Sequence, residues 1–290
     1  MPGDKIPEVN LGEGLELLWS MRHQNKLKTG HLIGNRFDIT VRDVNPSHVV
    51  YVNDQLKQIK KNGLPNLYGP QRFGNGSINP RIGKSLLVQD WETCVLDLIK
   101  SKARFANKWS DALQNGKSFI ELCNQIPKNM CLLYLNAFQS ELFNKVLIKR
   151  KDKNLLNSCI EGDLIWAHAG RGSSFYLNNE EAFSKQFIER VSRCEVSPTG
   201  PIFGTKMRKP KGIPFEIEEE ILQDANIEIC DFALGRKLLK GARRPLRVPI
   251  DQVNLTSGAD NHGNFIRIQF ELPAGSYATV AIDYLLGVLP

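Results

Sequence analysis

An alternating segment at residues 34–43 constrains the fold more than any other part of the sequence. Its apolar side chains point to one face and its polar side chains to the other, a period of two that is typical of a strand with one buried face. The apolar positions are Phe37, Ile39 and Val41, and the polar ones are Arg36, Asp38, Thr40 and Arg42. Residues 265–272 alternate in the same way. The sequence therefore predicts strands near both ends of the chain.

The sequence between these two strands has mainly helical patterns. A first helix is expected over residues 48–61, where Gly63 would end it. Further helices are expected over residues 85–106, 131–150, 180–193, 216–225 and 229–240. Residues 196–214 are rich in Pro and Gly and are expected to form a loop. Strands at both ends with helices between them predict an α+β protein whose sheet domain is interrupted by a helical domain.

The charge distribution is compatible with a polyanionic partner. The chain of 290 residues has a net charge of +7 and a pI of about 9.0, a mild excess that does not require such a partner. Basic residues gather over residues 206–211 and 236–247, with an acidic segment at 216–220 between them. Such runs more often form solvated helix faces than nucleic-acid sites, so charge alone leaves both interpretations open.

The cysteines and the N-terminus predict a cytoplasmic protein. Six cysteines occur without a C-x-x-C pair, which favours reduced thiols. The first residues lack the apolar core of a secretory signal, and no apolar run is long enough to span a bilayer. The five histidines are too dispersed to predict a metal site, and Gly83-Lys84-Ser85 lacks the upstream glycine of a P-loop.

Several stretches along nearly the whole chain resemble, in the same order, the signatures of one enzyme family. The most specific is residues 64–74, which are similar to a P-N-[YF]-[FY]-G-x-Q-R-F-G signature. Residues 137–144 resemble an A-x-[QR]-S-x-L-F-N helix, and residues 272–279 resemble a segment that ends in G-S-[FY]-A-T. Weaker counterparts lie at residues 22–37, 162–164 and 201–204. Together they are similar to the TruD family of tRNA pseudouridine synthases.

The resemblance implies both a fold and an activity. It implies a pseudouridine synthase domain with a mixed or antiparallel sheet, built from residues 1–74 and 245–290 and incomplete at its N-terminus. A largely helical insertion would occupy residues 75–244. The implied activity is the isomerisation of uridine to pseudouridine in tRNA, without a metal or organic cofactor and without a membrane partner. Because the target base must leave the stack, such a site needs a flat apolar surface to hold it.

The resemblance also implies roles for individual residues. Asn35, Phe37 and Tyr277 would contact the substrate, with Tyr277 at a position where the family has Phe or Tyr. By composition alone Phe37 and Tyr277 would more often be core residues. The candidates for contact with RNA phosphates are Lys26, Arg72, Arg243 and Arg244.

The chain departs from the family pattern at the catalytic residue. The family's nucleophilic aspartate lies in a G-x-K-D…T-x-Q motif, and nothing before Arg22 matches it, because Gly3-Asp4-Lys5 has a different order. The catalytic residue is therefore unknown from the sequence. A terminal apolar helix is expected to begin near Ser276, and in it Asp283-Tyr284 replaces the family's Arg-Glu.

Three alternatives follow from this departure. The chain could be the truncated product of a longer gene, which predicts a G-x-K-D motif upstream in the genomic frame. It could be a non-catalytic RNA-binding fragment or tRNA chaperone. It could also use another nucleophile, for which Asp38 and Asp43 lie nearest, although Asp38 alternates away from Phe37.

Overall fold

The computed structural model describes residues 24–26, 31–169, 174–177, 184–233 and 239–288. The chain forms two compact units, Met1–Ile33 and Gly34–Pro290, and the elements below belong to the second unit. The Gly3-Asp4-Lys5 segment lies outside the described residues.

The predicted terminal strands pair with each other in an antiparallel sheet. The order is β1-β9-β8, formed by β1 (Gly34–Arg42), β9 (Gly263–Pro273) and β8 (Asp251–Asp260). Phe37 lies opposite Phe270 in the register, and the apolar face of β9 is fully buried. The alternation of both segments predicted the two strands, and both strands are confirmed. The predicted apolar face is fully buried in β9, whereas Phe37, Ile39 and Val41 of β1 are only partly buried.

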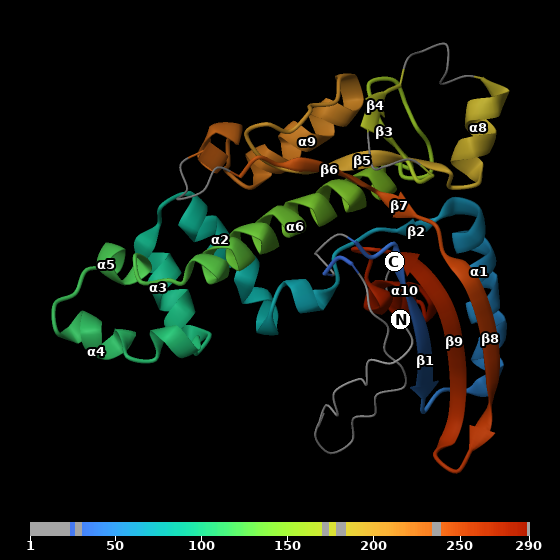
Figure 1. Cartoon of the computed structure of the whole chain (residues 1–290), viewed down its shortest axis with the longest axis horizontal. Coiled ribbons are helices and arrows are strands. Elements are labelled where there is room, and N and C mark those ends of the chain that lie inside the picture. The colour runs from blue at the N-terminus through green and yellow to red at the C-terminus, as the bar shows by residue number, and fades with distance from the viewer. Residues whose placement is uncertain (1–23, 27–30, 170–173, 178–183, 234–238, 289–290) are drawn as a thin grey trace. The chain divides into compact units, whose positions relative to one another are not determined.

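Two helices cover the apolar face of this sheet (Figure 1). They are α1 (Val49–Asn62), preceded by a 3-10 turn at Pro46–His48, and α10 (Ala278–Leu285). Gly63 ends α1 as predicted, because its φ of 79° is readily adopted by glycine. The core between helices and sheet includes Leu56, Ile268 and Ala281.

The helical part is built around one long helix, α6 (Lys128–Asp152), which packs against α2 (Ile78–Leu87). The remaining elements here are α3 (Trp91–Lys100), α4 (Trp109–Gln114), α5 (Phe119–Cys123) and 3-10 turns at Asn75–Ser77 and Arg104–Ala106. The prediction of one helix over 85–106 is wrong, because Gln89 has a φ of 60° and the Asp90 carboxylate accepts the Thr93 N–H to start α3.

Gly83 explains how closely α2 approaches α6. A Cβ atom at this position would lie 2.1 Å from the Tyr134 carbonyl oxygen. The glycine that invites a P-loop interpretation therefore serves helix packing.

A second sheet contains four antiparallel strands in the order β4-β3-β5-β6. The strands are β3 (Leu164–Ala167), β4 (Ser174–Tyr176), β5 (Val196–Ile202) and β6 (Ala242–Pro245). Helices α8 (Lys185–Ser192) and α9 (Gly212–Asp224) and the 3-10 turn Ile229–Ala233 complete this part. The loop predicted over 196–214 is wrong for β5, which is almost entirely buried.

A short ladder joins the chain segments on either side of the helical part. β2 (Leu64–Pro65) pairs with β7 (Arg247–Val248), and the loop after β2 contains the 3-10 turn Pro70–Arg72. The Arg247 guanidinium is buried and donates to the carbonyl oxygens of Asn62 at 2.7 Å, Val196 at 3.2 Å and Val191 at 3.4 Å. One side chain therefore connects the end of α1 with α8 and β5.

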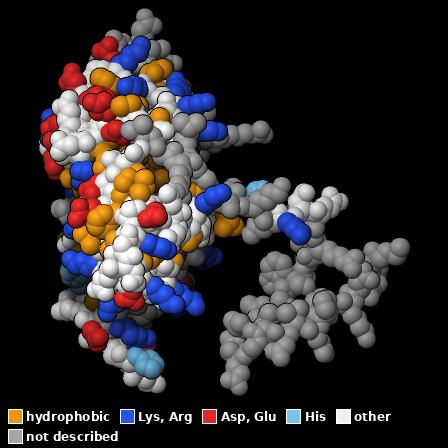
Figure 2. All heavy atoms as spheres, turned by 90° about the vertical axis from the view of Figure 1, so that its left-hand side faces the viewer, with side chains coloured by type: hydrophobic (Ala, Val, Ile, Leu, Met, Phe, Trp, Pro, Cys, Tyr) orange, Lys and Arg blue, Asp and Glu red, His pale blue; other side chains and the backbone are white. Residues whose placement is uncertain are grey.

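The side chains on one face of the molecule and the state of the cysteines complete the description of the fold. On the face shown in Figure 2, Lys and Arg side chains are interspersed with acidic and apolar side chains. All six cysteines are free thiols. Among the described residues, no helix is both long and apolar enough to cross a membrane.

Candidate functional site

Tyr68 lies at the centre of an aromatic and polar cluster in the loop after β2. Its backbone N–H donates to Asn144 Oδ1 at 2.9 Å, and Asn144 Nδ2 donates back to the Tyr68 carbonyl oxygen at 3.0 Å. The ring of Phe143 meets the Tyr68 ring edge-on, with centroids 5.5 Å apart. Helix α6 therefore fixes both the backbone and the ring of Tyr68.

Arg244 on β6 stacks on the same ring. Its Cζ atom lies 4.3 Å from the Tyr68 ring centroid, a distance typical of a cation–π contact. Its Nη2 donates to Asn66 Oδ1 at 2.6 Å and to the Gly275 carbonyl oxygen at 2.9 Å. Burial lowers the pKa of Arg244, since no described carboxylate pairs with it. Arg244 thus connects the loop after β2 to the turn that precedes α10.

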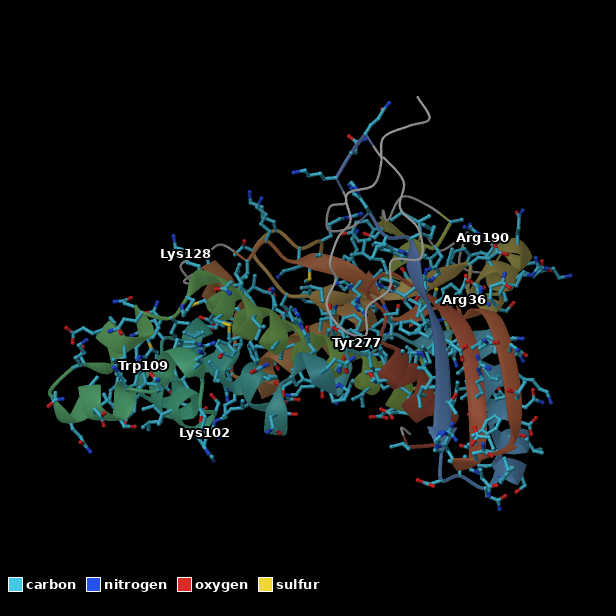
Figure 3. All side chains as sticks on the ribbon, turned by 60° about the horizontal axis from the view of Figure 1, so that its bottom comes forward. Arg36, Lys102, Trp109, Lys128, Arg190 and Tyr277 are labelled. Carbon is cyan, nitrogen blue, oxygen red and sulfur yellow. The ribbon has the colours of Figure 1, made fainter. Side chains whose placement is uncertain are left out.

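Tyr277 is the residue at which that turn enters α10, and it lies between the three-stranded sheet and the helices (Figure 3). Its ring meets the Tyr68 ring edge-on at 5.7 Å between centroids. A Cβ atom at Gly69 would lie 3.0 Å from Tyr277 Cδ1, so the glycine lets the loop approach this ring. Burial raises the pKa of the Tyr277 phenol. Tyr277 is half-buried, and the Tyr68 ring and the guanidinium groups of Arg72 and Arg244 lie around it.

Arg72 completes the cluster from the 3-10 turn that follows Tyr68. Its Nε donates to Ser140 Oγ on α6 at 3.2 Å, and its Cζ lies 5.8 Å from the Tyr68 ring centroid. Arg72 is only partly buried. We call the set Asn66, Tyr68, Arg72, Asn144, Arg244 and Tyr277 the Tyr68 cluster.

The structure brings three of the predicted site residues together and places two others beside them. Arg72, Arg244 and Tyr277 share the Tyr68 cluster. Asn35 and Phe37 lie on β1, where Asn35 is opposite Leu272 near the end of β9 that leads to Tyr277. Asn35 is exposed, whereas Phe37 is partly buried and packs on Phe270 with ring centroids 5.4 Å apart.

Arg243 has a different environment from its neighbour. Its guanidinium donates to both carboxylate oxygens of Glu218 at 2.9 and 2.7 Å and to Thr199, and the side chain is 4% exposed. This burial contradicts the expectation that Arg243 contacts RNA phosphates, because its donors are already used inside the protein. Lys26 belongs to the Met1–Ile33 unit and is exposed there.

Asp38, one of two alternative nucleophiles, is held by an ion pair across the sheet. Its carboxylate accepts from Arg267 Nε at 2.7 Å and from Gln269 Nε2 at 2.9 Å. The hydrogen bonds from Arg267 and then Gln269 lower the pKa of Asp38 to about 2. Asp43 is exposed and has a φ of 55° just after β1. This geometry gives Asp38 a structural role, and we assign no nucleophile among the described residues.

Sequence reasoning missed Tyr68, Asn66 and Asn144 as members of the site. All three lie inside the two matched segments at residues 64–74 and 137–144. Their hydrogen bonds join positions 76 or more residues apart, which a single sequence does not reveal. The available signal was an Asn on a helix that is otherwise buried and a Tyr in an ordered loop.

Comparison with known proteins gives consistent matches over most of the chain. A family model described as tRNA pseudouridine synthase D (TruD) matches residues 1–115 and 96–283. The tRNA pseudouridine synthase D of Geobacter metallireducens is 33% identical over 301 residues, which cover 93% of this chain and 72% of the relative. That of Geotalea daltonii is 31% identical, with 95% and 76% covered.

A solved structure shares the fold. It is a Methanosarcina mazei protein assigned to tRNA pseudouridine synthase D, 20% identical to this chain, with a TM-score of 0.75. The match covers 89% of this chain and 70% of that protein. The predicted α+β class is therefore confirmed for the chain as a whole.

Proposed function

Since this chain belongs to the TruD family of tRNA pseudouridine synthases, we propose that it isomerises uridine to pseudouridine in tRNA. In this reaction the C–N glycosidic bond breaks and the uracil rejoins the ribose through its C5 atom, which loses its hydrogen. The observation that carries the proposal for the site is the half-buried Tyr277 ring, which lies with Tyr68 and Arg72 in matched family segments and close to Arg244 of the basic run 236–247.

The proposed roles follow from the surroundings of each side chain. Tyr277 holds the uracil of a flipped-out uridine against its ring face. Asn35 and Phe37 form the neighbouring wall, because β1 begins beside the segment that leads to Tyr277. Arg72 contacts phosphate, since the only hydrogen bond that its side chain forms among the described residues uses Nε. Arg244 holds the Tyr68 ring and the turn at Gly275 in place, so its role is to position these groups.

We further propose that residues 1–74 and 245–290 form the catalytic domain and that residues 75–244 form the insertion. The core beneath the three-stranded sheet supports this division, because its buried residues come only from positions 52–64 and 248–285. The two largest other cores use positions 82–239 alone. A smaller core around Phe143 and Leu246 joins the two parts.

We also propose that the partner is tRNA and that binding occurs in the cytoplasm. Six free thiols support a reducing compartment. Lys26 is a second candidate for phosphate contact, because it is exposed.

The release of tritium from tRNA that carries 5-tritiated uridine tests the reaction directly. The intact chain is expected to release tritium. Replacement of Tyr277 by Leu is expected to lower kcat/KM by about 5- to 150-fold, because base–aromatic stacking contributes about 1–3 kcal/mol. Tyr277→Phe keeps the ring and is expected to stay within about twofold of the wild type.

Tyr51 on α1 supplies a matched control, because it is 40% exposed and lies outside the Tyr68 cluster. Tyr51→Leu is expected to leave the rate of tritium release unchanged. If the intact chain binds tRNA without releasing tritium, it is a non-catalytic RNA-binding protein and the proposal is wrong. An equal loss in Tyr51→Leu and Tyr277→Leu would remove the role proposed for Tyr277.

A further inference from the structure

Three exposed cations lie beside two aromatic rings at the edge of the four-stranded sheet. Tyr176 lies on the edge strand β4, and the cations lie in the loop between β5 and α9. We call the set Tyr176, Arg208, Lys209 and Lys211 the β4 patch.

Contacts with aromatic rings hold the three cations in place. Arg208 Cζ lies 4.8 Å and Lys211 Nζ 5.4 Å from the Tyr176 ring centroid. Lys209 Nζ lies 5.5 Å from the ring centroid of Phe215 on α9. The ring quadrupole attracts each cation without neutralising it, so the positive charge stays available to another ligand.

Hydrogen bonds to the backbone keep the loop against the strand. The Tyr176 hydroxyl donates to the Lys209 carbonyl oxygen at 2.8 Å, and Arg208 Nη1 donates to the Ser174 carbonyl oxygen. The Lys211 N–H donates to the Gly162 carbonyl oxygen at 3.0 Å. The β4 patch is thus an ordered surface, and a ligand would not have to order it first.

The cations of the β4 patch differ from other basic residues in their lack of acidic partners. Arg243 pairs with Glu218, and Arg267 pairs with Asp38. None of the three cations in the β4 patch forms an ion pair with a carboxylate of the described residues. Three unneutralised charges on one loop require an anionic partner or solvent.

A cavity of about 630 Å³ opens beside Lys211. Tyr176, Lys211 and Ile213 line it, and so does the start of α9 at Gly212. Cavities of about 300–1,000 Å³ hold compact ligands, so this one has room for a nucleotide-sized group. Glu161 also lines the cavity.

The β4 patch is separate from the Tyr68 cluster but within reach of the same RNA. Two strands, β3 and β5, lie between β4 and the strand β6 that carries Arg244. Neighbouring strands are about 4.8 Å apart, which gives a distance of about 14 Å across the sheet. A bound tRNA spans more than this distance, so one molecule can contact both places.

We propose that the β4 patch is a second RNA-binding surface, at which Arg208, Lys209 and Lys211 contact the sugar-phosphate backbone of the bound tRNA. The proposal rests on the proposed function, which supplies the RNA. Contacts of this kind set affinity and orientation and do not select a sequence.

The dependence of tRNA affinity on salt tests the surface. The variant Lys209→Ala/Lys211→Ala removes two charges and leaves the backbone hydrogen bonds and the Arg208–Ser174 contact in place. Its plot of log K against log [KCl] is expected to be flatter by about 1.4 to 1.8, since each phosphate contact contributes about 0.7 to 0.9. If the affinities converge at 1 M salt, Kd at 0.1 M rises by about 25- to 60-fold.

Two further variants separate charge from folding. Lys209→Arg/Lys211→Arg keeps both charges and is expected to keep the wild-type slope. Lys100→Ala/Lys108→Ala removes two exposed lysines of the helical part and is expected to leave Kd within about twofold of the wild type. An equal loss in this control, or a wild-type slope in Lys209→Ala/Lys211→Ala, would overturn the proposal.

Binding to vesicles that contain phosphatidylserine tests whether the β4 patch binds a membrane surface in place of RNA. Loss of vesicle binding in Lys209→Ala/Lys211→Ala, with unchanged tRNA binding, would overturn the RNA assignment. A failure of the proposed function can be told apart from a failure of the β4 patch proposal. It appears as an absence of tritium release, regardless of how tRNA affinity depends on salt. Tritium release by the wild type with no effect of the double variant on tRNA affinity would refute the β4 patch alone.

Discussion

The arginines of this chain differ in function according to what surrounds each guanidinium. Arg243 and Arg244 are neighbours on β6, yet Arg243 is buried against a carboxylate and Arg244 is buried against an aromatic ring. Arg208 is exposed and also contacts a ring. The sequence alone groups such residues as basic, and only their environments separate an ion pair from a positioning residue and an RNA contact.

The buried pair of Arg243 and Glu218 predicts an unequal response to two similar substitutions on α9. Glu218→Gln leaves a buried guanidinium without its carboxylate, so we expect a loss of about 3–5 kcal/mol in the free energy of unfolding. Glu220→Gln breaks a pair with Lys149 in which the carboxylate is 44% exposed, and we expect a loss below about 1 kcal/mol. Urea unfolding of both variants measures the difference, and similar losses would contradict the structural role of Arg243.

His168 predicts a pH dependence of stability. Burial, with a contribution from Arg247, lowers the pKa of His168 from 6.5 to about 4. The folded state therefore binds fewer protons than the unfolded state between these values, and its stability falls as the pH decreases through this window. We expect His168 to contribute a loss of about 2 kcal/mol between pH 7 and pH 4.5.

Thermal unfolding of His168→Gln over the same pH range isolates this contribution. Glutamine does not titrate, so the variant is expected to lose less stability than the wild type on acidification. Parallel curves for the two proteins would show that the pKa of His168 is the same in the folded and unfolded states.

At the scale of elements, strands and helices with a regular apolar pattern were predicted correctly, whereas a strand that contains two prolines was not. The alternation in β1 and β9 depends on burial of one face, which the sequence records directly. The apolar stripe predicted α6 as well, although residues 137–140 show that the middle of this helix is buried on more than one face. β5 contains Pro198 and Pro201, and proline normally argues against an inner strand. The strand persists because the Pro198 carbonyl oxygen still accepts the Leu246 N–H at 2.9 Å and the Thr199 hydroxyl donates to the Leu164 carbonyl oxygen at 2.7 Å.

The candidate site shows the same limit. Arg72 and Tyr277 were predicted from matched segments and Arg244 from the basic run 236–247, and the structure places all three around one ring. Tyr68 itself and its partner Asn144 could not be predicted, since their roles depend on a loop that reaches α6 across 76 residues of sequence. Local patterns predict elements, whereas contacts between distant elements need the fold.

A side chain at Gly200 on β5 would crowd the contact with α6 and lower the free energy of unfolding. A Cβ atom there would lie 2.7 Å from Leu246 Cδ2 and 2.8 Å from Phe143 Cε2. We therefore expect Gly200→Ala to lower the free energy of unfolding by about 1–3 kcal/mol. Gly258→Ala on β8 is the control, because its Cβ would meet Phe265 at an ordinary 3.4 Å. Chemical denaturation of both variants tests this, and equal stabilities would contradict it.

At the scale of the whole molecule, Arg247 connects the two parts of the Gly34–Pro290 unit. Its guanidinium bonds carbonyl oxygens at the ends of α1 and α8 and at the start of β5. Lysine keeps the charge but cannot present a planar set of donors to three carbonyl groups. Arg247→Lys is therefore expected to lower the free energy of unfolding by about 2–4 kcal/mol.

Arg190 on α8 is the control for this prediction. It forms a long contact of 3.7 Å with Glu195, and its side chain is 43% exposed. Arg190→Lys is expected to change stability by less than about 0.5 kcal/mol, and differential scanning calorimetry of both variants measures the difference. A loss as large as that of Arg247→Lys would show that the three carbonyl bonds contribute little.

The pairing of β1 with β9 has a consequence for synthesis on the ribosome. Asp38 and Arg267, which meet across these strands, are 229 residues apart in the chain. At about 5–20 residues per second, β1 waits roughly 10 to 50 s before its partner has been translated. During that interval the helices between them can fold, while an amphipathic strand with an unpaired backbone stays available to chaperones or to wrong partners.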